Sequence, residues 1–379
     1  MFEETKRFCD SLLQKGVPFF DVAVYVDGNC VLRHNGGYID PEKTIPMTGK
    51  ERYNIYSCSK PITCTAAMQL WEKGLFSLED PLSKYMPEFA EMTVKTEDGL
   101  RPAQKPILIR HLFEMTAGFS YAIRTPHLLR AREETDGCPT RELMKYLARE
   151  PLLFDPGEQW RYSLCHDVLA ALVEVVSGQS FDTYVRTHIF EPLGMTNSTF
   201  LLPQAQREGL ATQYRFDAET GTASPCGQQN NYIFGENYAS GGAGCVSTVD
   251  DYIKFGEGLR TGKLVKLQTL KLMQTDRLTP EQSRTYTAAK NYGYGLGLRC
   301  HKEGGIRKEF GWGGAAGAYF AIDEERKMTV FMAMHLLNSP VQGIRGMVYR
   351  FAAAELFAKE RTEDLWKELE TLHNYHLTY

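Results

Sequence analysis

Stretches rich in β-branched and aromatic residues lie near both ends of the chain, and they predict strands there. After a first helix in "MFEETKRFCDSLLQKG", the runs "FDVAVYV" and "CVLRHN" are separated by "DGN", a good signal for a two-residue hairpin turn. Further strands are predicted far downstream, at 292–300 ("YGYGLGLRC"), 316–323 ("AGAYFAID") and 327–335 ("KMTVFMAMH"), the last two joined by "EER". A helix over roughly 343–360 follows the last of these strands.

The segments between these ends, from about residue 57 to 285, have mostly helical periodicity. Leu164, Val168, Leu172 and Val176 recur every four positions, and Gly178 follows as a C-cap. Strands early and late with helices between them predict an α/β (α+β) fold: one antiparallel sheet built from both chain ends, flanked by helices, with an inserted mostly helical lobe. We expect a single domain over 1–379, in which 1–56 and 286–379 form the α/β lobe and 57–285 the helical lobe.

The composition fits a globular protein that acts on small molecules. Its 379 residues are 43% hydrophobic and 12% aromatic, which is enough for a sizeable core. The 43 basic and 47 acidic residues form no long block of one sign, so neither nucleic acid nor a membrane is expected as a partner. The N-terminus lacks the apolar core of a signal peptide, and no run reaches the roughly 18 apolar residues of a spanning helix. A cytoplasmic location is therefore predicted.

Nine cysteines are scattered from Cys9 to Cys300 without a C-x-x-C pair. This pattern indicates neither a disulfide framework nor a cysteine zinc site, so we expect reduced, mostly buried thiols. No metal or other cofactor is predicted, and the sequence gives no indication of the oligomeric state.

The stretch "YSCSKPITCTAAMQL" places Ser57 three residues before Lys60 at the start of an apolar run. If a helix begins at Ser57, Pro61 falls in its first turn and the two side chains lie on one face, within reach of each other. A lysine that burial or positive neighbours keep partly neutral can take a proton from a serine hydroxyl. Chance alone gives about one S-x-x-K in a chain like this, so the alternative is an N-capping serine with a solvated lysine.

Other candidate residues are less well placed. "GFSYA" approaches the G-x-S-x-G nucleophile elbow, but the residues before Ser120 have a helical period, whereas an elbow must follow a strand. His166 and Asp167 are adjacent on a helix, point in different directions and cannot orient each other. We interpret His111 as a helix histidine with satisfied hydrogen bonds and Cys58 as a packing residue.

Three segments together resemble a known family. "YSCSKP", "FDPGEQWRYSLCHDVLAALVEVVSG" and "EFGWGGAAGAYFAID" are similar to the S-x-x-K, Y-x-N and K-T-G motifs of penicillin-recognising serine hydrolases. Their order is that of class C β-lactamases and their esterase relatives, with family VIII carboxylesterases the most similar branch. "IRHLFEMTAGF", "EPLGMTNSTF" and "SGGAGCVSTVDDYIKFGEGL" extend the resemblance from about residue 20 to 355.

The resemblance implies a serine hydrolase that works through an acyl-enzyme. Ser57 would attack an acyl carbon, and Lys60 and Tyr162 would be the proton-transfer pair, although the sequence does not decide which of them is the base. The oxyanion would be bound by the N–H groups of Ser57 and Ala315. The remaining expected contributors to substrate binding are Gly313 and Gly314 at the start of a strand, Trp312 as pocket wall or core anchor, and Tyr121 in the acyl pocket.

Two departures from the family pattern sharpen the expected substrate. Leu164 stands where β-lactamases and carboxypeptidases have an asparagine that binds a substrate amide, and Trp312 stands where they have a lysine that binds a carboxylate. Both changes favour a carboxylesterase for small neutral esters; Arg307 and Lys308 are the nearby candidates to replace the lost cation. The alternatives are a β-lactamase or D-amino-acid peptidase, an acyltransferase, and a non-catalytic binding protein.

Overall fold

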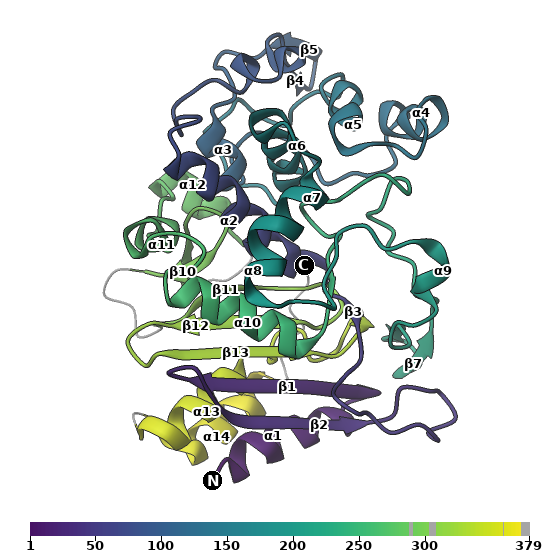
Figure 1. The fold of residues 1–379 in the computed structure, drawn as a ribbon, viewed down its shortest axis with the longest axis vertical. Coiled ribbons are helices and arrows are strands. Elements are labelled where there is room, and N and C mark those ends of the chain that lie inside the picture. Colours follow the sequence, from purple (N-terminus) through teal and green to yellow (C-terminus); the bar gives the residue numbers. More distant parts are fainter. Residues whose placement is uncertain (288–290, 303–307, 359, 373–379) are drawn as a thin grey trace.

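The computed structural model describes residues 1–287, 291–302, 308–358 and 360–372, and its largest element is a seven-stranded sheet (Figure 1). Every neighbouring pair of strands in this sheet is antiparallel. In spatial order the strands are β2 (Asn29–Gly37), β1 (Phe19–Val26), β13 (Met328–Ala333), β12 (Tyr319–Asp323), β11 (Phe310–Gly313), β10 (Arg299–His301) and β9 (Tyr292–Tyr294).

The sheet is built from both ends of the chain. β1 and β2 form the predicted hairpin, whose turn residues Asp27 and Gly28 have φ values of 50° and 81°, as a type I′ turn requires. β1 also pairs with β13, in register from Asp21 opposite Ala333 to Val26 opposite Met328. The predicted fold class, an antiparallel sheet flanked by helices, is therefore confirmed.

Helices cover both faces of the sheet. On one face α1 (Glu3–Leu13) contacts β1 and β2, and α13 (Met347–Phe357) packs between α1 and α14 (Thr362–Leu372). On the other face α10 (Val249–Arg260) contacts β1, β12 and β13, and Tyr252 stacks on Phe331 with ring centroids 4.1 Å apart. Gly256 of α10 is required there, because an added Cβ would lie 2.6 Å from a Thr329 side-chain atom.

The remaining helices gather above the sheet in Figure 1, where α6 (Cys165–Ser177) packs against α2, α3 and α5. As predicted, α6 ends at Gly178, whose φ of 69° is the left-handed conformation typical of a C-cap. The others are α2 (Ser59–Glu72), α3 (Ile109–Phe113), α4 (Pro126–Glu134), α5 (Thr140–Leu147), α7 (Phe181–Val185) with the π-helix Arg186–Phe190, α8 (Glu191–Leu193), α9 (Gln204–Arg207), α11 (Leu267–Met273) and α12 (Pro280–Thr285).

The chain also contains short 3₁₀ helices and small sheets that the helical period did not predict. Three single-turn 3₁₀ helices lie at Tyr56–Cys58 (η1), Leu82–Lys84 (η2) and Pro87–Phe89 (η3). Small sheets are formed by β3 (Tyr53–Asn54) with β8 (Val246–Ser247), by β4 (Thr93–Thr96) with β5 (Gly99–Pro102), and by β14 (Leu336–Leu337), β6 (Tyr214–Asp217) and β7 (Thr222–Pro225). The division into lobes at residues 57 and 285 stays a prediction.

Three expectations about individual elements were wrong. The single strand predicted at 292–300 is two strands, β9 and β10, because Gly297 takes a φ of 80° and turns the chain. The Trp-Gly-Gly motif ends strand β11 rather than starting a strand. The α-helix expected from Ser57 begins at Ser59, with Ser57 in the preceding turn of η1. No helix in the described residues is long and apolar enough to cross a membrane.

Candidate active site

Ser57 lies at the centre of η1, immediately before α2, and is 8% exposed. The preceding Tyr56 has a φ of 48°, a conformation that is uncommon for a bulky residue. Tyr56 is fixed by its hydroxyl, which donates to Gln213 Oε1 at 2.6 Å. Such a local outlier is typical of functional sites, where the surrounding contacts hold a side chain in a required direction.

Lys60 is fully buried, and its ammonium group points back toward Ser57. Its Nζ lies 3.3 Å from Ser57 Oγ and donates to the carbonyl oxygen of Gly242 at 2.6 Å. The one-turn separation of Ser57 and Lys60 therefore brings their side chains together, as the spacing predicted. Nζ also lies 4.6 Å from the ring centre of Tyr162 and 5.4 Å from that of Tyr121, within the range of cation–π attraction.

Tyr162 approaches the same serine oxygen from the loop before α6. Its hydroxyl lies 2.5 Å from Ser57 Oγ. Its ring is nearly parallel to that of Trp312, with centroids 6.1 Å apart, and makes an edge contact with Tyr121 at 5.0 Å. This stacking holds the phenol in place. Lys60 and Tyr162, two groups able to carry a proton, therefore both lie next to the Ser57 hydroxyl.

The Trp-Gly-Gly motif passes close to the chain that leads into Ser57. An added Cβ at Gly314 would lie 2.4 Å from the carbonyl oxygen of Ile55, and one at Gly313 would lie 2.1 Å from Arg345. Glycine is therefore required at position 314 by the close backbone, whereas a side chain at position 313 would require the flexible Arg345 side chain to move. In the described part of the chain, the N–H groups of Ser57 and Ala315 donate to no backbone carbonyl, so both can still bind a substrate oxygen.

Arg345 is the cation beside this motif, and the sequence analysis did not single it out. Its guanidinium donates to the Gly314 carbonyl oxygen at 3.0 Å, next to Gln342 Nε2 at 3.3 Å. Of the two predicted substitutes for the missing lysine, Lys308 is exposed and Arg307 lies outside the described residues.

The other candidate residues His166, Cys58 and Leu164 are buried. His166 contacts Cys64 and the Phe113 carbonyl, and burial lowers its pKa to about 3. Cys58 is buried, which raises its thiol pKa to about 12, and Leu164 is buried in the main hydrophobic cluster. The expectation for His111 was wrong in part, because only Nδ1 has a partner and Nε2 has none among the described residues.

Two features near Lys60 were missed by sequence reasoning. One is the backbone at 240–244, "SGGAG", whose Gly242 carbonyl accepts from Lys60. The other is Asp167, which accepts hydrogen bonds from Tyr238, Ser240 and Gly242 instead of orienting His166. The run of small residues was the available signal, since it permits the backbone to approach a buried side chain closely.

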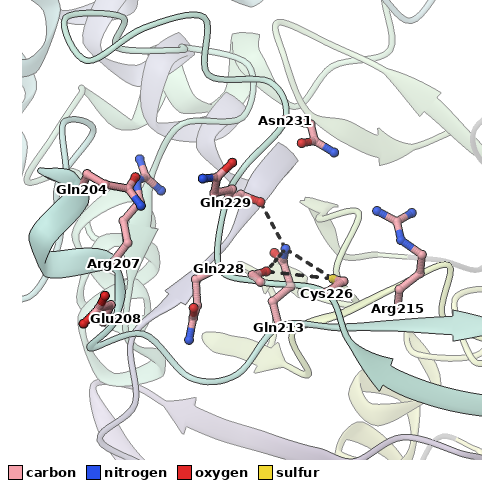
Figure 2. Close-up of a pocket in the computed structure, with 10 residues that line it drawn as sticks. Gln204, Arg207, Glu208, Gln213, Arg215, Cys226, Gln228, Gln229 and Asn231 are labelled. Carbon is pink, nitrogen blue, oxygen red and sulfur yellow. Dashed lines mark hydrogen bonds between the residues drawn. The ribbon is translucent and has the colours of Figure 1, made fainter.

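A separate cavity of about 310 Å³ lies beside Gln213, the residue that accepts from the Tyr56 hydroxyl (Figure 2). Among the described residues that line it are Gln213, Gln228, Gln229 and Arg207, so its walls are polar. Gln213 connects this cavity to the site, because it accepts from Tyr56 and its Nε2 donates to the Gly227 and Gln229 carbonyl oxygens. Ser57, Lys60 and Tyr162 do not line it.

Comparisons with known proteins agree with this architecture. The chain is 29% identical over 314 residues to Protein Rv1367c of Mycobacterium tuberculosis, covering 76% of this chain and 78% of that protein. It is 26% identical over 347 residues to Esterase EstB of Burkholderia gladioli, covering 84% and 85%. The solved structure of EstCE1, described as a hydrolase with promiscuous acyltransferase activity, has a TM-score of 0.75 and 26% identity, covering 92% of this chain and 98% of that one.

The family profile described as Beta-lactamase matches residues 6–354, which is nearly the whole chain. This match and the esterase relatives confirm the predicted resemblance to serine β-lactamases and family VIII carboxylesterases. The S-x-x-K segment, Tyr162 and the Trp-Gly-Gly strand all lie within the matched range. The chain belongs to the Beta-lactamase family.

Proposed function

We propose that the protein is a carboxylesterase that cleaves small neutral esters through an acyl-enzyme on Ser57. The observation that carries this proposal is the convergence of Lys60 Nζ, at 3.3 Å, and the Tyr162 hydroxyl, at 2.5 Å, on Ser57 Oγ. A serine hydroxyl becomes an effective nucleophile only when such a partner takes its proton. The proposal is supported further by the similarity to a relative named as an esterase.

In the first half of the reaction, Ser57 Oγ bonds to the ester carbonyl carbon and its proton passes to the Lys60–Tyr162 pair. The carbonyl oxygen takes up negative charge and accepts from the N–H groups of Ser57 and Ala315. The bond to the alcohol oxygen then breaks, and the pair returns the proton to that oxygen. In the second half, water attacks the acyl carbon, gives a proton to the pair, and Ser57 leaves with it.

The neutral substrate class is inferred from the two motif positions that depart from the family pattern. Trp312 stacks on Tyr162 and offers no charge, and Leu164 is buried and offers no hydrogen bond. The rings of Tyr121 and Tyr232 lie 5.1 Å apart and add apolar area near the site. A small acyl group can pack against such rings, whereas the carboxylate of a peptide or β-lactam needs a positive partner.

Acyl transfer to an alcohol is the second candidate activity. It is favoured by the similarity to EstCE1, whose description includes promiscuous acyltransferase activity. The two reactions share the acyl-enzyme and differ only in whether water or an alcohol attacks it. Adding an alcohol acceptor during turnover of p-nitrophenyl acetate separates them, since transfer produces the acceptor's ester.

The main test compares a p-nitrophenyl ester with a chromogenic cephalosporin, together with a fluorophosphonate label. We expect rapid ester turnover, slow cephalosporin turnover, and a single adduct on Ser57 by peptide mapping. Cephalosporin cleavage without ester cleavage would replace the esterase by a β-lactamase. A folded protein that takes no label at Ser57 would remove the acyl-enzyme altogether and favour a binding protein. The cytoplasmic location stays a prediction.

A further inference from the structure

Asp167, on the first turn of α6, is a buried carboxylate with an uneven set of hydrogen bonds. Asp167 is 1% exposed. Oδ1 accepts from the Tyr238 hydroxyl at 2.7 Å, the Ser240 hydroxyl at 2.6 Å and the Gly242 N–H at 3.3 Å. Oδ2 has no hydrogen-bond partner within the described ranges. A buried polar atom without a partner is unusual and calls for an explanation.

The unpartnered oxygen faces the ammonium group of Lys60. A methyl group added at Gly242 would lie 2.4 Å from Asp167 Oδ2 and 3.4 Å from Lys60 Nζ, so these two atoms are at most about 6 Å apart. The same short segment bridges them chemically, because the Gly242 N–H donates to Asp167 while its carbonyl accepts from Lys60. The carboxylate and the ammonium therefore both contact Gly242.

The other groups around Lys60 supply hydrogen bonds or polarity but no counter-charge. Burial lowers the pKa of His166 to about 3, so this imidazole is neutral at ordinary pH. Burial likewise raises the pKa values of the Cys64 thiol and the Tyr121 phenol. Besides Asp167, the groups around Lys60 are the hydroxyls of Ser57, Tyr121 and Tyr162, the Gly242 carbonyl, the thiols of Cys58, Cys64 and Cys165, and His166 in the first turn of α6.

We propose that Asp167 is a positioning residue whose carboxylate holds Lys60 as an ammonium ion directed at Ser57. A buried cation is costly unless an anion is near it, and Asp167 provides that anion without displacing Lys60 from Ser57. Three hydrogen bonds hold Oδ1 in place, and Oδ2 has no hydrogen-bond partner among the described residues. The proposal rests on the proposed function of Ser57 and narrows it, because an ammonium ion at Lys60 leaves Tyr162 as the member of the pair that takes the Ser57 proton.

The test is the pH dependence of kcat/KM for p-nitrophenyl acetate in the wild-type protein and in Asp167→Asn. Asparagine keeps one acceptor oxygen for Tyr238, Ser240 and Gly242, removes the charge, and puts an uncharged amide NH2 in place of Oδ2. Without the anion Lys60 loses its proton at lower pH, so activity that needs the ammonium is lost earlier as pH rises. We expect the alkaline limb to move down by about 1 pH unit or more, with KM changed less than about twofold.

The matched control is Tyr238→Phe, which removes one hydrogen bond to Asp167 and leaves its charge in place. Its alkaline limb should stay at the wild-type pH, even if its thermal stability falls. An Asp167→Asn protein that folds normally and keeps both limbs at the wild-type pH would overturn the proposal. Increased activity of that variant at high pH would overturn it as well.

A second variant covers the case in which Asp167→Asn does not fold. Gly242→Ala places a methyl group against both Oδ2 and Nζ, and relieving that contact moves the charges apart, so the alkaline limb should shift in the same direction by a smaller amount. An unshifted limb in folded Gly242→Ala contradicts the proposal. Failure of the proposed function has a different signature, because the wild-type protein would then show neither ester turnover nor a Ser57 adduct, and the role of Asp167 would fall with it.

Discussion

Asp21 and Asp167, two of the buried aspartates that lie near cationic side chains, are bonded in opposite ways. Asp21 on β1 accepts from the Arg33 guanidinium on both carboxylate oxygens, with Arg33 Nη2 3.1 Å from Oδ2. Asp167 accepts three hydrogen bonds on one oxygen and has the other without a partner in the described structure. The Asp21–Arg33 pair, in which both carboxylate oxygens are bonded, connects two strands. The Asp167 carboxylate has one oxygen without a hydrogen bond, and it lies near Lys60 and Ser57.

The surroundings of Asp21 explain why its pair is structural. Arg33 also donates to the carbonyl oxygens of Gly49 and Val22, so it connects β2 to β1 and to the segment after it. Burial raises the pKa of Asp21, and Arg33 opposes that rise. A pair of this kind adds little net stability, yet removing one partner leaves a buried charge and is strongly destabilising.

The largest expected effect belongs to the region around Asp167. Ser57→Ala removes the proposed nucleophile but hardly changes packing, so ester hydrolysis should fall by about 10⁴-fold or more. The thermal midpoint should stay within a few degrees of wild type. Both are measured with p-nitrophenyl acetate and a thermal unfolding curve. Activity within tenfold of wild type would place the chemistry elsewhere.

Tyr162→Phe should produce the next largest effect. It removes the hydroxyl 2.5 Å from Ser57 Oγ and keeps the ring that stacks on Trp312. We expect kcat to fall by about 10²- to 10⁴-fold, since a proton-transfer group is lost. Tyr294→Phe is the matched control, because its ring contacts Trp312 while its hydroxyl has no partner in the described structure. Equal losses in both variants would reduce Tyr162 to a packing role.

Asp21→Asn tests the other side of the comparison. It removes the negative charge and one of the two acceptor oxygens opposite Arg33, and we expect the free energy of unfolding in urea to fall by about 3 kcal/mol. The folded variant should keep the wild-type pH profile of kcat/KM, whereas Asp167→Asn should change that profile and lose less stability. If Asp21→Asn changed the pH profile and Asp167→Asn mainly lost stability, Asp21 would be the functional residue and Asp167 the structural one.

The smallest expected effect concerns two buried histidines, which are neutral at ordinary pH. Burial lowers the pKa values of His111 and His166 to about 3, below the value near 6.5 expected in the unfolded chain. The unfolded state therefore binds more protons as pH falls, so stability is lost from about pH 6.5 down to about pH 3. Each histidine should contribute roughly 1 kcal/mol between pH 6.5 and 5.5. His111→Gln should flatten this dependence in urea unfolding, and an unchanged slope would mean that His111 is not the source.

Local chemistry was enough to predict several elements of this protein. The one-turn spacing of Ser57 and Lys60, the Asp27–Gly28 turn and the end of α6 at Gly178 each depend on residues within a few positions of one another. The sequence misread 292–300 as one strand, because the left-handed φ of Gly297 depends on its packing: a Cβ there would lie 2.1 Å from the sulfur of Cys64.

By itself, the sequence determined the motifs, their order and the fold class, since these follow from periodicity, turn residues and a matched family pattern. Only the tertiary structure decided which groups meet Lys60. Its bond to Gly242 joins positions 182 residues apart, and the contact of Tyr162 with Ser57 spans 105. Asp167 could not be assigned from its helix position alone, because the loop that returns "SGGAG" to α6 sets its partners. Such contacts form only when distant segments pack, and no local preference encodes them.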